Sequence, residues 1–157
     1  HRGEFVPVTP LHHAGICVAD MARSLRFYVD GIGLTVLVDK VLEADLAPLL
    51  GVHTTSVRTV FLGDPAHTDA GIVELLDLGL PDIARAPGQP GLPGRGVFLL
   101  SVQVDVPMVL DRLAALDLGG TPRTMPTPGG GLAATVVEPD GVMVELLARG
   151  RLSLMNG

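Results

Sequence analysis

The tetrapeptide Val-Glu-Leu-Leu occurs twice in this chain, at residues 73–76 and again at residues 144–147. Each copy ends an apolar run late in its half of the chain. Because successive side chains of a strand point to opposite faces, each copy places its acid on the same face of an equivalent strand. The repeat predicts a duplicated module, in which two modules face each other and bring Glu74 and Glu145 to one site.

The order of sequence patterns is similar in the two halves, as a duplication requires. Alternation and apolar runs in the first half predict strands at residues 11–18, 34–42, 54–62 and 72–78. A helix is expected after the first of these strands, with Asp20 as its N-cap. The second half predicts strands at residues 97–105, 132–137 and 142–147, and a helix that begins near Pro107, after Asp105. Residues 122–131 are rich in Pro and Gly and are expected to form a loop.

These patterns divide the chain into two modules, at residues 9–80 and 97–149. The linker between them, residues 81–96, is rich in Pro, Gly and Ala and shows no periodicity. Short tails of residues 1–8 and 150–157 flank the modules, and the first tail is expected to be in part a remnant of cloning. The expected fold class is therefore α+β, with two modules sharing one core.

Composition narrows the possible functions. Of the 157 residues, 47% are apolar and only 3% are aromatic, so the core must consist of aliphatic side chains. The net charge of −6 without a run of Lys or Arg argues against nucleic-acid binding. No apolar run approaches the ~20 residues of a membrane span. The single cysteine, Cys17, favours a reducing compartment, so we expect a cytoplasmic protein, and the residue usage is typical of a GC-rich bacterial genome.

Three motifs are specific enough to indicate a family. They are His-His-Ala-Gly-Ile-Cys-Val-Ala-Asp at residues 12–20, Ser-Leu-Arg-Phe-Tyr at 24–28 followed by Gly-Ile-Gly-Leu at 31–34, and Glu-Pro-Asp-Gly at 138–141 before the second Val-Glu-Leu. Together they resemble the vicinal oxygen chelate superfamily, which includes glyoxalase I, methylmalonyl-CoA epimerase, extradiol dioxygenases, fosfomycin-resistance enzymes and bleomycin-binding proteins. The resemblance spans residues 9–149 and implies two βαβββ modules whose curled sheets enclose a cleft.

The resemblance also implies a metal site with one residue from the first and the last strand of each module. The matching positions are His13 and Glu74 in the first module, and Leu99 and Glu145 in the second. The family commonly has His at the position of Leu99, whose side chain cannot bind a metal. One imidazole and two carboxylates suit Zn, Ni, Co, Mn or Fe(II), and three protein ligands leave positions for water and substrate.

Several histidines leave alternatives open. His12 is the neighbour of His13 and could exchange roles with it, because the start of the strand is uncertain by one residue. His53 and His67 fall near expected loops, where solvated surface positions are the usual outcome. Either of the two could instead replace the missing fourth ligand.

Alternation along the strands predicts the rest of the cleft. The side chains expected to line it, besides the metal ligands, are Cys17, Leu99, Ser101, Gln103 and Met143. Arg58, on the third expected strand, is a candidate anchor for an anionic substrate. Apolar walls with a few polar groups are typical of a small-molecule pocket.

Two carboxylates buried close together need either a cation between them or a proton on one of them. With a metal, Glu145 and Glu74 could move a proton beside a polarised carbonyl, as in a glyoxalase-type or epimerase-type isomerase or lyase. Without a metal, the alternatives are an acid–base enzyme of the same fold or a protein that binds and sequesters an antibiotic or another natural product, which Leu99 favours. An extradiol dioxygenase is a third alternative. The family resemblance also implies a homodimer.

Overall fold

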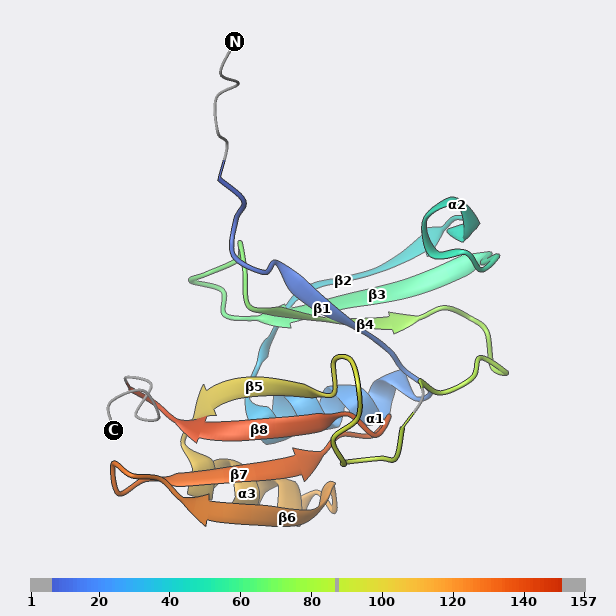
Figure 1. The fold of residues 1–157 in the computed structure, drawn as a ribbon. Coiled ribbons are helices and arrows are strands. Elements are labelled where there is room, and N and C mark those ends of the chain that lie inside the picture. The colour runs from blue at the N-terminus through green and yellow to red at the C-terminus, as the bar shows by residue number, and fades with distance from the viewer. Residues whose placement is uncertain (1–6, 87, 151–157) are drawn as a thin grey trace.

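The computed structural model describes residues 7–86 and 88–150, which form two four-stranded sheets with a few helices (Figure 1). The strand order is β1-β4-β3-β2 in the first sheet and β5-β8-β7-β6 in the second. In each sheet one edge strand pairs in parallel, β1 with β4 and β5 with β8, while the other pairs are antiparallel. The expected α+β fold of two βαβββ modules is confirmed.

The first module contains β1 (His13–Cys17), α1 (Met21–Leu25), the π-helical segment η1 (Arg26–Ile32), β2 (Thr35–Glu43), α2 (Ala47–Leu50), β3 (Ser56–Gly63) and β4 (Ile72–Asp77). Asp20 caps α1 as expected, because its Oδ1 accepts the N–H of Arg23 at 3.1 Å. The helix ends at Gly33, whose φ of 102° lies in the left-handed region that glycine adopts readily.

The second module contains β5 (Leu99–Val104), α3 (Val106–Ala115), β6 (Gly119–Pro126), β7 (Leu132–Val137) and β8 (Met143–Ala148). Asp105 caps α3 by accepting the N–H of Met108 at 3.1 Å. The strand β6 corrects the sequence-based prediction, which placed the start of a loop within it. Pro122 and Pro126 suggested a loop, but β6 is an exposed edge strand, where a missing N–H need not cost a ladder hydrogen bond.

The two modules share one hydrophobic core. Buried side chains from both sheets and from α1, η1 and α3 form a single cluster, which includes Ile16, Leu75, Val109 and Leu146. The segment η1 packs against α3, and Figure 1 shows α1 and α3 on one side of the second sheet. One side of each sheet therefore packs on the shared core. No helix in the described part of the chain is long and apolar enough to cross a membrane.

The strand pairing shows that the repeated acids are structurally equivalent. Glu74 pairs with Gly15, the third residue of β1, and Glu145 pairs with Ser101, the third residue of β5. In β8, as in β4, the residues on either side of the acid contribute to the core. Both acids therefore lie on the sheet faces that point away from the core.

Candidate functional site

An imidazole and a carboxylate meet on the outer face of the first sheet. Nε2 of His13 lies 3.4 Å from Oε1 of Glu74, and their side chains are 39% and 15% exposed. The other oxygen of Glu74 accepts the hydroxyl proton of Thr59 at 2.8 Å, and Thr59 is buried. The ring of Phe61 flanks His13, with 5.6 Å between ring centroids. One carboxylate oxygen is thus fixed by β3, while the other is directed at the imidazole.

The second nitrogen of His13 contacts His12. Their Nδ1 atoms lie 2.8 Å apart, so one of them must carry the proton of this hydrogen bond. If His12 donates, Nε2–H of His13 is free to donate to Glu74. If His13 donates, its Nε2 presents a lone pair beside a carboxylate, an arrangement that calls for a proton or a cation between them. In both cases His13, rather than His12, faces Glu74.

The outer face of the second sheet carries the equivalent acid. Oε1 of Glu145 accepts the hydroxyl proton of Ser101 at 2.9 Å. Leu99 is the first residue of β5, as His13 is the first residue of β1, and it pairs with Met143. Gln103 is on the same face and donates through Nε2 to the carbonyl of Gly150 at 3.2 Å. An aliphatic side chain therefore stands where the first sheet has its imidazole.

Glu145 does not join His13 and Glu74 within one chain. In residues 7–86 and 88–150, no three His, Cys, Asp or Glu side chains form a group that could hold a metal ion. The physical reason is that β4 and β8 belong to different sheets, whose outer faces are turned away from a common core. The prediction that the two modules of one chain face each other across one site is corrected accordingly. His13 and Glu74 fit two positions of a divalent metal site, and one chain adds no third.

Arg58 lies on the opposite face of the first sheet from Glu74. Phe61 pairs with Glu74, and residues of β3 alternate between faces, so Arg58 is on the side of Val60. Its guanidinium binds Asp39 through Nε and Nη2 at 3.0 and 2.8 Å. This hydrogen bonding lowers the pKa of Asp39. The structure therefore places Arg58 away from Glu74 and engaged by Asp39, and its role as an anchor for an anionic substrate stays a prediction.

The two remaining histidines lie at exposed positions. Nδ1 of His53 is 2.9 Å from Asp45, and Nδ1 of His67 is 3.1 Å from Asp64. Neither belongs to a group of three potential metal ligands in the described part of the chain. The structure therefore offers no support for either histidine as a replacement ligand.

Cys17 lines a cavity of about 680 Å³ between β1, the linker and the turn between β7 and β8. Burial raises the pKa of its thiol, and the charges of Asp140 and Asp77 add to this effect. Of the other described residues predicted for the substrate pocket, none lines this cavity: Leu99, Ser101, Gln103, Met143 and Arg58 all lie outside it. The predicted pocket residues therefore do not surround one space in a single chain.

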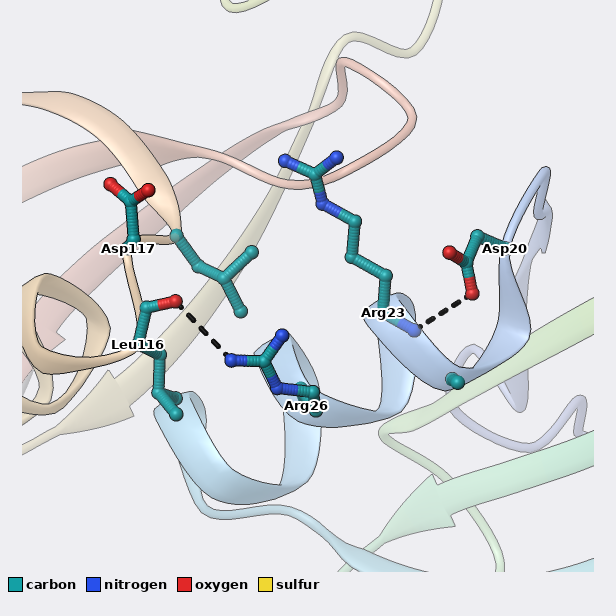
Figure 2. A pocket seen from close by; sticks show the side chains of 7 residues that line it. Asp20, Arg23, Arg26, Leu116 and Asp117 are labelled. Atoms are coloured by element: carbon teal, nitrogen blue, oxygen red, sulfur yellow. Dashed lines mark hydrogen bonds between the residues drawn. The ribbon is translucent and has the colours of Figure 1, made fainter.

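A second hollow, of about 370 Å³, lies between the start of α1 and the end of α3 (Figure 2). Nη2 of Arg26 donates to the carbonyl of Leu116 at 3.4 Å, and Asp20 caps α1 beside it. Asp117, with φ of 55°, is the only described non-glycine residue with a positive φ. The hydrogen bond of Arg26 joins the turn after α3 to the start of η1, which indicates a structural role.

Sequence reasoning missed a buried acid at Glu138. Glu138 is only 2% exposed. Its Oε1 accepts the N–H groups of Asp140 and Val142, both at 2.8 Å. Its Oε2 accepts the hydroxyl proton of Tyr28 at 3.4 Å. Burial raises the pKa of Glu138 to about 7. Burial and the neighbouring Glu138 also raise the pKa of Tyr28. The Glu-Pro-Asp-Gly motif was a signal for the turn, but it contains no information about burial.

Comparison with known proteins identifies the family. The family model described as Glyoxalase/Bleomycin resistance protein/Dioxygenase superfamily matches residues 10–146. The chain belongs to this superfamily. It is 35% identical, over 157 aligned residues, to the Lactoylglutathione lyase-like protein terB of Aspergillus terreus, with 91% of this chain and 78% of that protein covered.

Solved structures of the superfamily share the fold. The trypanothione-dependent glyoxalase I of Leishmania major is 23% identical, with a TM-score of 0.63, and the match covers 93% of this chain and 89% of that one. The antibiotic-binding protein TnmS3 from a Streptomyces species is 21% identical, with a TM-score of 0.55, and the match covers 93% and 100% of the two chains. The same architecture thus occurs in an enzyme and in a binding protein.

Proposed function

We propose that this superfamily member is a glyoxalase-type lyase or isomerase, which moves a proton beside the carbonyl of a small oxygenated molecule. The observation that carries the proposal is the contact of 3.4 Å between Nε2 of His13 and Oε1 of Glu74 on an accessible sheet face. The identity of 35% to a protein named lactoylglutathione lyase-like supports the same class of reaction.

Each residue of this group has a chemical task. Thr59 holds one oxygen of Glu74, and the other, when it is not bound to a metal, can take a proton from a carbon next to a carbonyl and return it. His13 orients that oxygen through Nε2, while its Nδ1 contacts His12. The ring of Phe61 supplies an apolar wall, which strengthens these polar contacts by limiting water.

A divalent metal (Zn, Ni, Co, Mn or Fe) would be held by Nε2 of His13 and Oε1 of Glu74, with Glu145 of a second copy as third ligand. A second copy is invoked because the described residues of one chain offer no group of three ligands. When bound, such an ion would polarise the carbonyl of the substrate. The homodimer is therefore part of the proposal. Leu99 lines the composite site without binding the ion.

The test is turnover of the hemithioacetal of methylglyoxal and glutathione, followed by absorbance. We expect Glu74→Gln to lower kcat by roughly 10²–10⁴-fold, the usual contribution of a general base. The matched control is Glu43→Gln, which alters an exposed acid on β2 bonded to Ser56. Full activity in Glu74→Gln, or no turnover by the wild-type protein of this or related hemithioacetals, would overturn the proposal.

The metal is tested separately, on protein purified without a chelator. We expect stoichiometric metal in the wild-type protein and a loss of metal in Glu145→Gln. Unchanged metal content in Glu145→Gln would remove Glu145 from the ligand set. Undiminished turnover after chelation would favour a metal-free acid–base enzyme, and oxygen uptake with catechol and Fe(II) would favour a dioxygenase.

A second candidate is a metal-free protein that binds an antibiotic or another natural product. The observation in its favour is Leu99, which replaces the imidazole of the first sheet with an aliphatic side chain. A rise of Tm with bleomycin but not with Zn²⁺ or Ni²⁺, together with no turnover, would support this candidate. The cytoplasmic location expected from the cysteine content stays a prediction.

A further inference from the structure

The cavity beside Cys17 has the size and walls of a small-molecule site. Its volume of about 680 Å³ falls within the range of roughly 300–1,000 Å³ that is usual for ligand pockets. Ile83, Leu92 and Phe98 contribute apolar side chains to its lining, and all three are partly exposed. The candidate reacting residues His13 and Glu74 do not line it.

The linker that covers the cavity is held in place by the second module. Nε of Arg85 donates to the carbonyl of Asp140 at 3.1 Å, and the N–H of Gly91 donates to the carbonyl of Gly141 at 3.0 Å. Gly91 also accepts a hydrogen bond from Arg123 at 2.9 Å. These contacts hold the linker against the second module at Arg85 and at Gly91, which favours a cavity that exists before a ligand arrives.

The positive groups of the cavity are available to a ligand. Arg85 and Arg95 both line it, and neither takes part in any ion pair found in the described part of the chain. The guanidinium of Arg85 uses Nε for the linker contact, which leaves its terminal nitrogens to donate elsewhere. Two guanidinium groups without acidic partners favour an anion.

The acids of the cavity are already engaged. Oδ1 of Asp140 accepts the N–H of Ala19 at 3.0 Å, and its Oδ2 accepts the hydroxyl proton of Ser24 at 3.4 Å. Oδ1 of Asp77 accepts the N–H of Gly79 at 2.9 Å. These donors are neutral and both carboxylates keep their charge, so the anionic group of a ligand has to lie nearer Arg95 and Arg85 than Asp140 and Asp77.

We propose that this cavity binds a small amphipathic anion. Its carboxylate, sulfonate or phosphate group binds Arg95 and Arg85, and its apolar part packs on Ile83, Leu92 and Phe98. This site is additional to the proposed reaction site, and its test does not depend on turnover.

The test uses anilinonaphthalene sulfonate, which combines aromatic rings with one anionic group, and the full-length chain. Calorimetry and fluorescence are expected to show saturable binding of one molecule per chain. Arg95→Gln is expected to weaken binding about tenfold, the effect of losing one charge-assisted hydrogen bond. The matched control is Arg58→Gln, which removes the same charge from an arginine outside the cavity and is expected to bind as the wild-type protein does.

The single cysteine provides a second, independent arm. Cys17 lines the cavity, so reaction with N-ethylmaleimide at mildly alkaline pH places a bulky group inside it. In that reaction the Cys17 sulfur adds to the maleimide double bond and the thiol proton ends on the neighbouring carbon. Treatment is expected to abolish dye binding in the wild-type protein and to leave binding by Cys17→Ser unchanged.

Three results would overturn the proposal. They are wild-type affinity in Arg95→Gln, retained binding after complete labelling of Cys17, and loss of binding in His13→Ala, which would place the dye on the outer sheet face instead. Far-ultraviolet circular dichroism of each variant establishes that it is folded.

Discussion

A single buried acid links the two modules at the level of individual residues. Glu138 lies in the turn between β7 and β8 and accepts the hydroxyl proton of Tyr28 from η1. Its pKa is about 7 in the folded protein, against an ordinary value of 4.5. Folding therefore favours the protonated form. The stabilising contribution of Glu138 is complete below about pH 4.5, declines as the pH rises, and is lost above about pH 7.

Replacing this acid by its amide is expected to remove that pH dependence. In Glu138→Gln, Oε1 can still accept the N–H groups of Asp140 and Val142, and Nε2 can donate to Tyr28. Urea unfolding at pH 5 and pH 8 should show that the wild-type protein loses roughly 2.5 kcal/mol more stability than the variant between these values.

The control for this experiment is Asp82→Asn, which removes an exposed acid of the linker and should behave as the wild-type protein does. The prediction fails if Glu138→Gln loses as much stability between pH 5 and pH 8 as the wild-type protein.

Residue-level predictions succeeded where a local rule decides the outcome. Asp20 and Asp105 cap helices because an N-cap depends only on the next few residues. The sheet face on which Arg58 lies, by contrast, is not decided by its sequence neighbours. Its face follows from the pairing of β3 with β4, which joins residues distant in sequence, and a shift of one residue moves every side chain to the other face.

Among the elements, the contact between η1 and α3 joins the modules most directly. Arg112 of α3 donates to the carbonyls of Gly31 and Ile32, at 2.9 and 3.2 Å. A Cβ at Gly31 would collide with Cδ2 of Leu113. We expect Gly31→Ala to destabilise the protein by about 1–3 kcal/mol, as overpacking usually does.

Denaturant unfolding measures this effect against Gly94→Ala. Gly94 has no atom within 4 Å of its would-be Cβ and no positive φ, so its substitution should change stability by no more than about 0.5 kcal/mol. Equal stability of the two variants would contradict the prediction and show that Leu113 makes room for the methyl group at little cost.

The element that the sequence misplaced is β6. Its prolines and glycines indicate a loop when they are read locally, and Gly119 and Gly120 indicate a helix end. Proline lacks the N–H that a central strand donates to its neighbour, but an edge strand has one side without a neighbour and tolerates it. Which strand lies at the edge depends on the pairing of the whole sheet and cannot be predicted from the local sequence. The other strands were predictable because a core face imposes a period of two on their apolar residues.

On the scale of the whole molecule, the prediction of two equivalent modules was confirmed, but the prediction that their acid faces meet within one chain was corrected. The alternation of apolar residues around Glu74 in β4 and Glu145 in β8 predicts that each acid lies on the face opposite the core. This alternation is the same whether those two faces of one chain point toward each other or apart. The packing of η1 on α3 decides between these arrangements, and it turns the acid faces away from a shared core. If His13, Glu74 and Glu145 form one site, as proposed above, a second copy of the chain must supply Glu145.

This requirement predicts that two inactive variants restore activity when they are mixed. His13→Ala disables the first-sheet half of each site, and Glu145→Gln disables the second-sheet half. After joint refolding in equal amounts, half of the dimers are mixed, and each mixed dimer has one intact site, so turnover should recover to about a quarter of the wild-type value. Mixing His13→Ala with Glu74→Gln should restore nothing, because both changes lie in the first sheet. If the first mixture is as inactive as its components while both variants fold and dimerise, the site is not shared between chains.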